Sequence, residues 1–204
     1  MNICYVIGAG EVERLDFAPD SSDMVICADG GYDHAKRFGI NADVIIGDFD
    51  SVQTLPEDIK AIRYPKEKDD TDSFLAVSYG MENGYRKFAL YGLLGGRLDH
   101  TYSNLELLSY ISDKGASAYA AGNGFTVYMI KNTSIRLLKK QSGIISVFSF
   151  SNECRGVSIK GLKYEVDDFT MTNSLTRGLS NEFIGKDAEI SVKEGKLIIF
   201  EQTE

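Results

Sequence analysis

Short apolar runs alternate with segments of helical periodicity over the first part of the chain. Such runs, several of which end at Gly or Asp, are typical of strands buried on both faces of a parallel sheet. We expect strands over Ile3–Gly8, Met24–Ala28, Val44–Ile46, Ala61–Tyr64, Lys87–Tyr91 and Ser117–Ala121. We expect helices over Tyr32–Phe38, Thr71–Met81 and His100–Ser112. This alternation predicts an α/β domain with a mostly parallel sheet.

The pattern changes after Gly122-Asn123-Gly124, beyond which no long helix is expected. Short strands punctuated by Gly, Asn, Asp and Ser predict an antiparallel β-sandwich. We expect them over Phe125–Ile130, Ile135–Leu138, Ile144–Phe150, Val157–Lys160, Tyr164–Phe169, Glu189–Val192 and Leu197–Phe200. Glu194-Gly195 predicts a hairpin between the last two strands. We therefore divide the chain into an α/β domain over residues 1–131 and a β-sandwich domain over residues 132–204.

The chain of 204 residues has a formal charge of −8, which argues against a general nucleic-acid partner. All of that surplus lies in residues 1–131, with 20 acids and 12 bases; residues 132–204 hold 10 of each. A solvated acidic surface would explain it, and so would a carboxylate cluster that binds cations. The chain shows neither a membrane-spanning run nor a signal-peptide start, and its three cysteines are widely spaced. We expect a cytoplasmic protein with reduced thiols and no membrane partner.

Acidic motifs follow the predicted strands at their carboxyl ends, where open α/β sheets bind ligands. They are Asp29-Gly30-Gly31, Gly47-Asp48-Phe49-Asp50-Ser51, Lys68-Asp69-Asp70-Thr71-Asp72 and Gly95-Gly96-Arg97-Leu98-Asp99. Asp48 and Asp50 would point to opposite faces of an extended strand, so a shared metal requires a turn, which Gly47 permits. With Asp72 and Asp99 at the same edge, these oxygen ligands predict a Mg²⁺ site. The alternative is a helix N-cap at Asp50 or Ser51.

Two further segments could contact phosphates. Lys66 and Lys68 could reach phosphate oxygens or simply lie on a solvated loop, while Thr71-Asp72 also fits a helix start. The loop Gly92–Arg97 combines small residues, whose N–H groups approach phosphates closely, with a guanidinium that binds them in a bidentate manner. It lacks the spacing and lysine of a Walker-type loop, which argues against an ordinary P-loop kinase.

The remaining candidates have simple structural interpretations. Neither His34 nor His100 has the partner spacing of a zinc site, and His100 fits a helix start as well as an acid–base role. Cys27 lies in an apolar strand and is expected to be a buried small residue. Residues 161–164 and 179–181 are typical of β-turns.

Taken together, these motifs resemble the thiamin pyrophosphokinase family. The matching segments are A-D-G-G at 28–31, G-D-F-D-S at 47–51, K-D-D-T-D at 68–72, G-G-R-L-D-H at 95–100, S-N-L-E-L-L at 103–108, G-L-K-Y at 161–164 and S-N at 180–181. They occur in family order along nearly the whole chain. The resemblance implies an α/β catalytic domain, a β-sandwich domain that helps to bind thiamin, and a homodimer with active sites shared between subunits.

The resemblance also implies the reaction, transfer of the diphosphoryl group of ATP to the hydroxyl of thiamin, which releases AMP. It implies that Asp48, Asp50 and Asp72 are Mg²⁺ ligands and that Asp99 orients or deprotonates the hydroxyl. The ATP-binding residues that it implies are Asp29, Gly30, Lys68, Asp69, Thr71, Gly95, Gly96 and Arg97. The thiamin-binding residues that it implies are Tyr164, Ser180 and Asn181, contributed by the partner subunit. Carboxylates would repel ATP alone, so bound Mg²⁺ must reverse the local sign.

One departure and two alternatives accompany this interpretation. Some family members have Trp where this chain has Tyr164, and Tyr stacks somewhat less strongly on a cationic ring. A haloacid-dehalogenase-like phosphatase would use Asp48 as its nucleophile, although two strands precede that motif and the Gly-Gly motifs would have no role. A thiamin or nucleotide sensor would bind both ligands without turnover.

Overall fold

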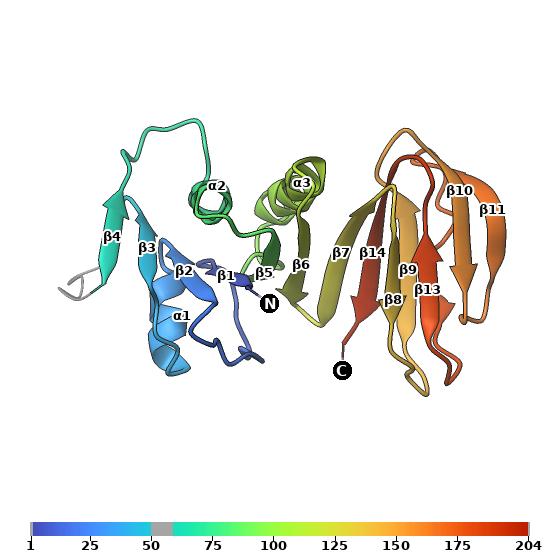
Figure 1. Ribbon diagram of the computed structural model, residues 1–204, viewed down its shortest axis with the longest axis horizontal. Helices are drawn as coiled ribbons and strands as arrows, with labels where there is room; N and C mark the ends of the chain where they lie inside the picture. Colours follow the sequence, from blue (N-terminus) through green and yellow to red (C-terminus); the bar gives the residue numbers. More distant parts are fainter. Residues whose placement is uncertain (1, 50–58, 204) are drawn as a thin grey trace. The chain divides into compact units, whose positions relative to one another are not determined.

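The computed structural model describes residues 2–49 and 59–203 (Figure 1). The chain divides into two compact units, Met1–Asn123 (unit 1) and Gly124–Glu204 (unit 2). The boundary predicted at residue 131 lies one strand further along, and the assignment of roles to either side of it stays a prediction. None of the described helices combines the length and the apolar character needed to cross a bilayer.

Unit 1 is an α/β unit whose strands are all parallel, in the order β6-β5-β1-β2-β3-β4 among the described residues. The strands are β1 (Cys4–Ile7), β2 (Met24–Ala28), β3 (Val44–Gly47), β4 (Lys60–Arg63), β5 (Lys87–Tyr91) and β6 (Ser117–Gly122). Every residue of β1 and β3 is buried, because helices or loops cover both faces. The predicted mostly parallel sheet is therefore confirmed, with strand ends within one residue of expectation.

Three helices flank this sheet: α1 (Gly31–Arg37), α2 (Asp72–Glu82) and α3 (Leu98–Asp113). Figure 1 shows α1 on one face of the sheet, with α2 and α3 on the other. Helix α2 begins as its sequence predicts, because the Thr71 Oγ1 accepts a hydrogen bond of 3.2 Å from the Phe74 N–H. Helix α3 begins two residues before the predicted start, at Leu98, which places Asp99 in its first turn.

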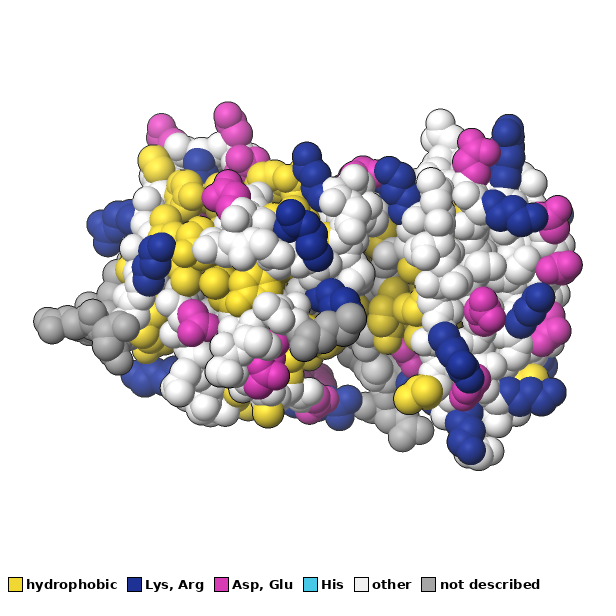
Figure 2. All heavy atoms as spheres, in the orientation of Figure 1, with side chains coloured by type: hydrophobic (Ala, Val, Ile, Leu, Met, Phe, Trp, Pro, Cys, Tyr) yellow, Lys and Arg dark blue, Asp and Glu magenta, His cyan; other side chains and the backbone are white. Residues whose placement is uncertain are grey.

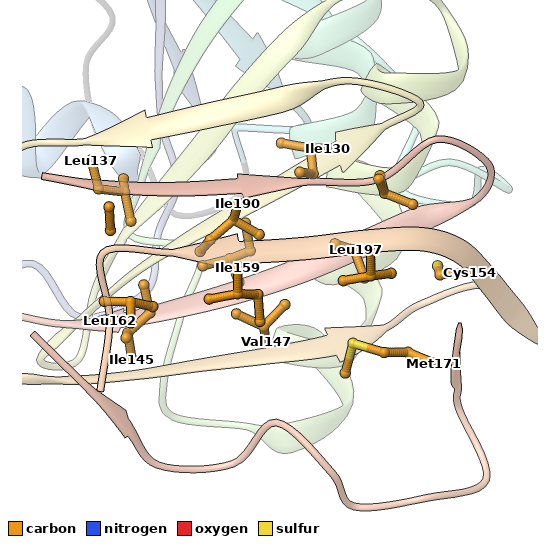
Figure 3. Packing of buried hydrophobic residues seen from close by; sticks show 14 of the residues in the cluster. Ile130, Leu137, Ile145, Val147, Cys154, Ile159, Leu162, Met171, Ile190 and Leu197 are labelled. Carbon is orange, nitrogen blue, oxygen red and sulfur yellow. The ribbon is translucent and has the colours of Figure 1, made fainter. Parts of the chain in front are cut away.

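Unit 2 is a sandwich of two antiparallel layers, as predicted. One layer has the order β11-β10-β13-β8, and the other contains β12-β9-β14-β7. The strands are β7 (Phe125–Lys131), β8 (Ser134–Leu137), β9 (Ile144–Ser149), β10 (Glu153–Lys160), β11 (Val166–Thr172), β12 (Asn181–Glu182), β13 (Ala188–Ser191) and β14 (Lys196–Gln202). Both layers contribute to one core, in which Ile145, Val147 and Leu197 pack with Ile159 and Ile190 (Figure 3).

Three local features of unit 2 differ from expectation. Strand β10 begins at Glu153 rather than Val157, since its register shifts between Cys154 and Val157 where Gly156 takes a φ of +65°. Strand β12 has only two residues, within a segment whose sequence resembles a turn. The predicted hairpin at Glu194-Gly195 is wrong, because β13 pairs with β8 and β10 whereas β14 pairs with β7 and β9. The connection therefore crosses from one layer of the sandwich to the other.

Candidate functional site

The carboxyl ends of the parallel strands in unit 1 share one edge of the sheet. Asp29 follows β2, Asp48 follows β3 and the loop Gly92–Arg97 follows β5. The loop after β4 leads to Asp72 at the start of α2. The topology therefore brings the four acidic motifs to the edge at which the sequence predicts a ligand. Asp50 and Ser51 lie outside the described residues.

The turns after β2 and β3 meet closely. The Asp29 N–H donates a 2.8 Å hydrogen bond to the Ile46 carbonyl, and a Cβ on Gly47 would lie 3.2 Å from the Asp29 Cα. Asp29 has a φ of +50°, a conformation that most L-residues avoid. This strained turn places the Asp29 Oδ1 in a buried position without a hydrogen-bond partner. A buried anionic oxygen of this kind is stabilised by a bound cation or donor.

The chain turns at Phe49, which is buried and takes a φ of +61°. The Arg63 guanidinium lies 5.6 Å from the centre of the Phe49 ring. The backbone is thus not extended at Phe49. Asp50, with which Asp48 was predicted to share a metal, lies outside the described residues.

Asp72 lies at the start of a helix and at the edge of the sheet where the sequence predicts a ligand. As the first residue of α2 it complements the helix dipole. The Lys68 Nζ lies 2.9 Å from the Asp72 Oδ1, with side chains 15% and 25% exposed. That oxygen is buried and has no partner in hydrogen-bond geometry, so the contact is an ion pair by distance only. A ligand arriving at this edge would meet a carboxylate and an ammonium already paired.

Arg97 and Asp99 form a bidentate pair at the end of the loop after β5. The Arg97 Nε and Nη2 donate to the two Asp99 oxygens at 3.1 and 2.6 Å. These hydrogen bonds lower the pKa of the Asp99 carboxyl to about 2. Both side chains are exposed, so the guanidinium is accessible to phosphate.

The donor set fits Mg²⁺, although no complete metal site lies within the described ranges. Across residues 2–49 and 59–203, no three His, Cys, Asp or Glu side chains come together as a metal-binding group. Asp29 and Asp72 nevertheless each offer a buried oxygen without a hydrogen bond. Such hard anionic oxygens are the ligands that Mg²⁺ takes in small number, its remaining positions being filled by water and phosphate.

In unit 2, Tyr164 and Asn181 are joined by a side-chain clamp. The Asn181 Oδ1 accepts hydrogen bonds of 2.9 Å from the N–H groups of Tyr164 and Glu182, and its Nδ2 donates to the Tyr164 carbonyl at 2.7 Å. Asn181 is buried, whereas Tyr164 is 59% exposed. The Ser180 N–H donates to the Ser146 Oγ at 3.0 Å. The three residues predicted from the resemblance therefore lie together, with the aromatic ring exposed.

The ring of Tyr164 already has a cation beside it. The Lys163 Nζ lies 5.4 Å from the ring centre and 2.6 Å from the Glu182 Oε1. Lys163 belongs to the G-L-K-Y motif but had no predicted role, and Glu182 was not among the predicted site residues. The contact brings two distant segments together, and no periodicity in the sequence signals it.

The structural interpretation of Cys27 is confirmed. Cys4 and Cys27 are fully buried, and burial, followed by the charge of Asp43, raises the pKa of each thiol to about 12. Neither thiol can serve as a nucleophile. His100 is exposed, and its backbone N–H donates to the Asp99 Oδ1 at 3.0 Å.

Comparison with known proteins agrees with this architecture. A family model described as "Thiamin pyrophosphokinase, catalytic domain" matches residues 18–120. A second, "Thiamin pyrophosphokinase, vitamin B1 binding domain", matches residues 132–197. A thiamine pyrophosphokinase of Bacillus subtilis (strain 168) is 28% identical over 182 residues, which are 78% of this chain and 77% of the relative.

Solved structures share the fold over the whole chain. The thiamine pyrophosphokinase from Bacillus subtilis has a TM-score of 0.87 at 23% identity, covering 100% of both chains. The thiamin pyrophosphokinase from Geobacillus thermodenitrificans has a TM-score of 0.84 at 25% identity, covering 100% of this chain and 98% of that one. With both family models matched in order, the chain belongs to the thiamin pyrophosphokinase family, whose activity is the pyrophosphorylation of thiamin with ATP.

Proposed function

We propose that diphosphoryl transfer takes place at the edge of unit 1 formed by the carboxyl ends of β2, β3 and β5. The observation that carries this proposal is the pair of buried carboxylate oxygens, Asp29 Oδ1 and Asp72 Oδ1, that lack hydrogen-bond partners there. Asp29, Gly30, Lys68, Asp69, Thr71, Gly95, Gly96 and Arg97 bind ATP. Asp48, Asp50 and Asp72 hold Mg²⁺.

The reaction forms a bond between the thiamin hydroxyl oxygen and the β-phosphorus of ATP. The bond from that phosphorus to the oxygen bridging it to the α-phosphorus breaks, AMP leaves with that oxygen, and the hydroxyl proton passes to a base. Positioning and electrostatic stabilisation supply most of the catalysis in such transfers. Bound Mg²⁺ would neutralise phosphate charge next to the carboxylates. The chain itself aligns the hydroxyl with the phosphorus.

Arg97 and Asp99 exchange partners in this scheme. Without substrate, the guanidinium binds Asp99 and lowers its pKa to about 2, which makes the carboxylate a poor base. When Arg97 turns to the phosphates, Asp99 loses those hydrogen bonds and its oxygens become available to the thiamin hydroxyl. It can then orient that hydroxyl or accept its proton.

Thiamin binds at Tyr164, Ser180 and Asn181 in unit 2. The exposed Tyr164 ring suits a cationic thiazolium, and the Asn181 clamp holds that ring in place. Lys163 beside the ring is neutralised by Glu182, which reduces its repulsion of a cationic substrate.

The active enzyme is a homodimer in which the thiamin residues of one subunit serve the catalytic residues of its partner. Unit 2 exposes several large apolar side chains, which a second copy would cover. They are Leu138, Ile144, Leu179 and Ile184. Mixing the impaired variants Asp72→Asn and Tyr164→Ala, assayed at thiamin concentrations far below the KM, tests the arrangement, because a mixed dimer regains one intact site of two. Recovery of about a quarter of the wild-type activity is expected, and no recovery would place both residue sets in one subunit.

The decisive assay incubates the protein with thiamin, ATP and Mg²⁺ and separates AMP from ADP. We expect AMP and thiamin diphosphate in equal amounts, and no AMP without Mg²⁺. Production of ADP would overturn the transfer of a diphosphoryl group. Activity that is unchanged by chelation would overturn the metal assignment alone.

A further inference from the structure

Two side chains of α3 reach back to the loop that carries Arg97. The Thr101 Oγ1 accepts a 3.1 Å hydrogen bond from the Gly95 N–H and donates one of 3.1 Å to the Gly95 carbonyl. Three residues later, the Asn104 Nδ2 donates a 2.8 Å hydrogen bond to the Leu93 carbonyl. Asn104 is 9% exposed. Both therefore hold the loop's backbone from the helix that follows it.

The opposite side of the same loop rests on the turn after β1. The Gly8 N–H donates to the Tyr91 carbonyl at 2.8 Å and the Gly10 N–H to the Gly92 carbonyl at 2.9 Å. A Cβ on Gly92 would lie 2.4 Å from the Gly8 carbonyl oxygen, and its φ is +65°. This end of the loop is thus fixed by backbone contacts alone.

The middle of the loop has no such backbone contact with the turn after β1. Gly95 and Gly96 have φ values of +89° and +63°. A Cβ on Gly95 would lie 3.2 Å from the Asn123 side chain, whereas one on Gly96 would meet no atom within 4 Å. Glycine loses more conformational freedom on ordering than any other residue. Thr101 makes two hydrogen bonds to Gly95 at this point, two residues before Arg97. The Thr101 side chain therefore holds the loop just before Arg97, and the Thr101 backbone N–H donates to the Arg97 carbonyl at 3.1 Å.

We propose that Thr101 and Asn104 are positioning residues for diphosphoryl transfer: they fix the Leu93–Gly96 backbone and so aim the Arg97 guanidinium at the phosphates of ATP. The inference rests on the proposed function, specifically on Arg97 as a phosphate ligand. Neither residue needs to touch a substrate. Asn104 lies in the S-N-L-E-L-L motif, for which no residue role was predicted, and it gains a positioning role here.

Thr101 provides the sharper test because two substitutions separate its hydroxyl from its shape. Thr101→Val keeps the volume and removes both hydrogen bonds, whereas Thr101→Ser keeps the hydroxyl. We expect Thr101→Val to raise the KM for ATP about 10-fold, as the loss of a positioning hydrogen bond does. The KM for thiamin should stay constant. Thr101→Ser should restore the KM for ATP to within about 2-fold, and a serine variant as impaired as the valine variant would contradict a hydroxyl role.

A double-mutant cycle with Arg97→Ala separates positioning from general structure. If Thr101 acts through Arg97, Thr101→Val has no further effect on the KM for ATP once Arg97 is absent. An undiminished effect in that background overturns the inference and leaves the proposed function intact. If Arg97→Ala alone leaves the KM for ATP unchanged, Arg97 is no phosphate ligand and both proposals for this loop fail.

Two further measurements address folding. Ser103→Ala changes an exposed residue of the same helix and should leave both KM values unchanged. Hydrogen exchange of the Gly95 amide should quicken in Thr101→Val relative to wild type and Thr101→Ser, since its acceptor is lost. Unchanged exchange at Gly95 in the valine variant, with the thermal midpoint preserved, would show that Thr101 does not hold the loop.

Discussion

Units 1 and 2 build their candidate sites in different ways. In unit 1 the site residues occupy turns at the ends of buried parallel strands, and backbone contacts between neighbouring turns hold them. In unit 2 one buried amide, that of Asn181, joins two segments 17 residues apart and holds an exposed ring. The parallel sheet thus positions its candidate site residues through chain topology. The antiparallel unit instead uses a buried polar side chain to hold the exposed ring.

The units also differ in charge. The acids in excess lie in residues 1–131, while residues 132–204 carry equal numbers of acids and bases. Figure 2 shows acidic and basic side chains interspersed over unit 2. Several form exposed ion pairs, such as Arg136 with Asp187 and Lys193 with Asp168, which contribute little stability. The sandwich is therefore stabilised mainly by its apolar core.

The largest expected effect concerns thiol protection and tests whether the two units unfold separately. Cys4 and Cys27 are buried in unit 1 and Cys154 in unit 2. Labelling by a thiol reagent at pH 8 should be slowed at least about 10³-fold in the native protein, because access requires unfolding. Mass spectrometry of samples labelled during a urea titration gives the order in which the three cysteines become accessible. Simultaneous labelling of all three would indicate one cooperative transition, whereas earlier labelling of Cys154 would show that unit 2 opens first.

Asp72→Asn should have the next largest effect and should affect the nucleotide side only. Removing one charge from the proposed cation site should lower kcat about 100-fold or more, as loss of one electrostatic element does. Thiamin binding should be unchanged. The steady-state rate of AMP release measures kcat, and calorimetry measures the affinity for Mg²⁺. Near wild-type kcat with normal Mg²⁺ affinity would leave Asp72 with its helix-start role alone.

Tyr164→Ala should affect the use of thiamin rather than the use of ATP. Loss of the ring should raise the KM for thiamin about 10-fold, a typical contribution of a cation–π contact in a partly desolvated site. The KM for ATP should change little, since Tyr164 belongs to unit 2. Tyr164→Phe serves as the matched control and should retain most of the affinity. A larger effect on ATP than on thiamin would move the thiamin site elsewhere.

The smallest expected effect is a change in the pKa of Asp99 in Arg97→Gln, separate from the rise in the KM for ATP that loss of a phosphate ligand causes. The Arg97 hydrogen bonds hold the pKa of Asp99 near 2, below its ordinary value of 3.8. Without them the pKa should rise toward 3.8, so that at pH 3.8 Asp99 is about half protonated in the variant and ionised in wild type. Any stabilisation by the ionised group is present above its ordinary pKa and lost as the pH falls through 2. Carboxyl-carbon NMR titration checks this shift, and an unchanged pKa would mean that the pair does not persist in solution.

The strands of unit 1 could be predicted because burial on both faces leaves continuous apolar runs. Met24–Ala28 and Lys87–Tyr91 match the expected bounds. Strand β12 could not be predicted, since two polar residues carry no periodicity. The hairpin at Glu194-Gly195 was predicted from turn-forming residues alone. The packing of the two layers instead leads the chain from β13 in one layer to β14 in the other.

Chain topology accounts for only part of the candidate site. Motifs that follow parallel strands lie at one edge of the sheet, so Asp29, Asp48 and Asp72 could be assigned to that edge from the sequence, whereas their roles stay predictions. Side-chain partners such as Thr101 with Gly95 depend on the exact path of a loop. No pattern of spacing encodes that path, and the same holds for the Lys163 contact with Glu182.

The contact between Gly8, Gly10 and Gly92 has a practical consequence for protein engineering. An added methyl at Gly10 would lie 2.6 Å from the Gly92 carbonyl oxygen, and one at Gly92 would meet Gly8. Substitutions at these positions are therefore coupled through rigid backbone and cannot be screened one at a time. A library that seeks a different phosphate donor should keep the three glycines and randomise positions 97 and 98, where Leu98 is 84% exposed. Substitutions at positions 97 and 98 would change the exposed end of the loop and leave its glycine contacts intact.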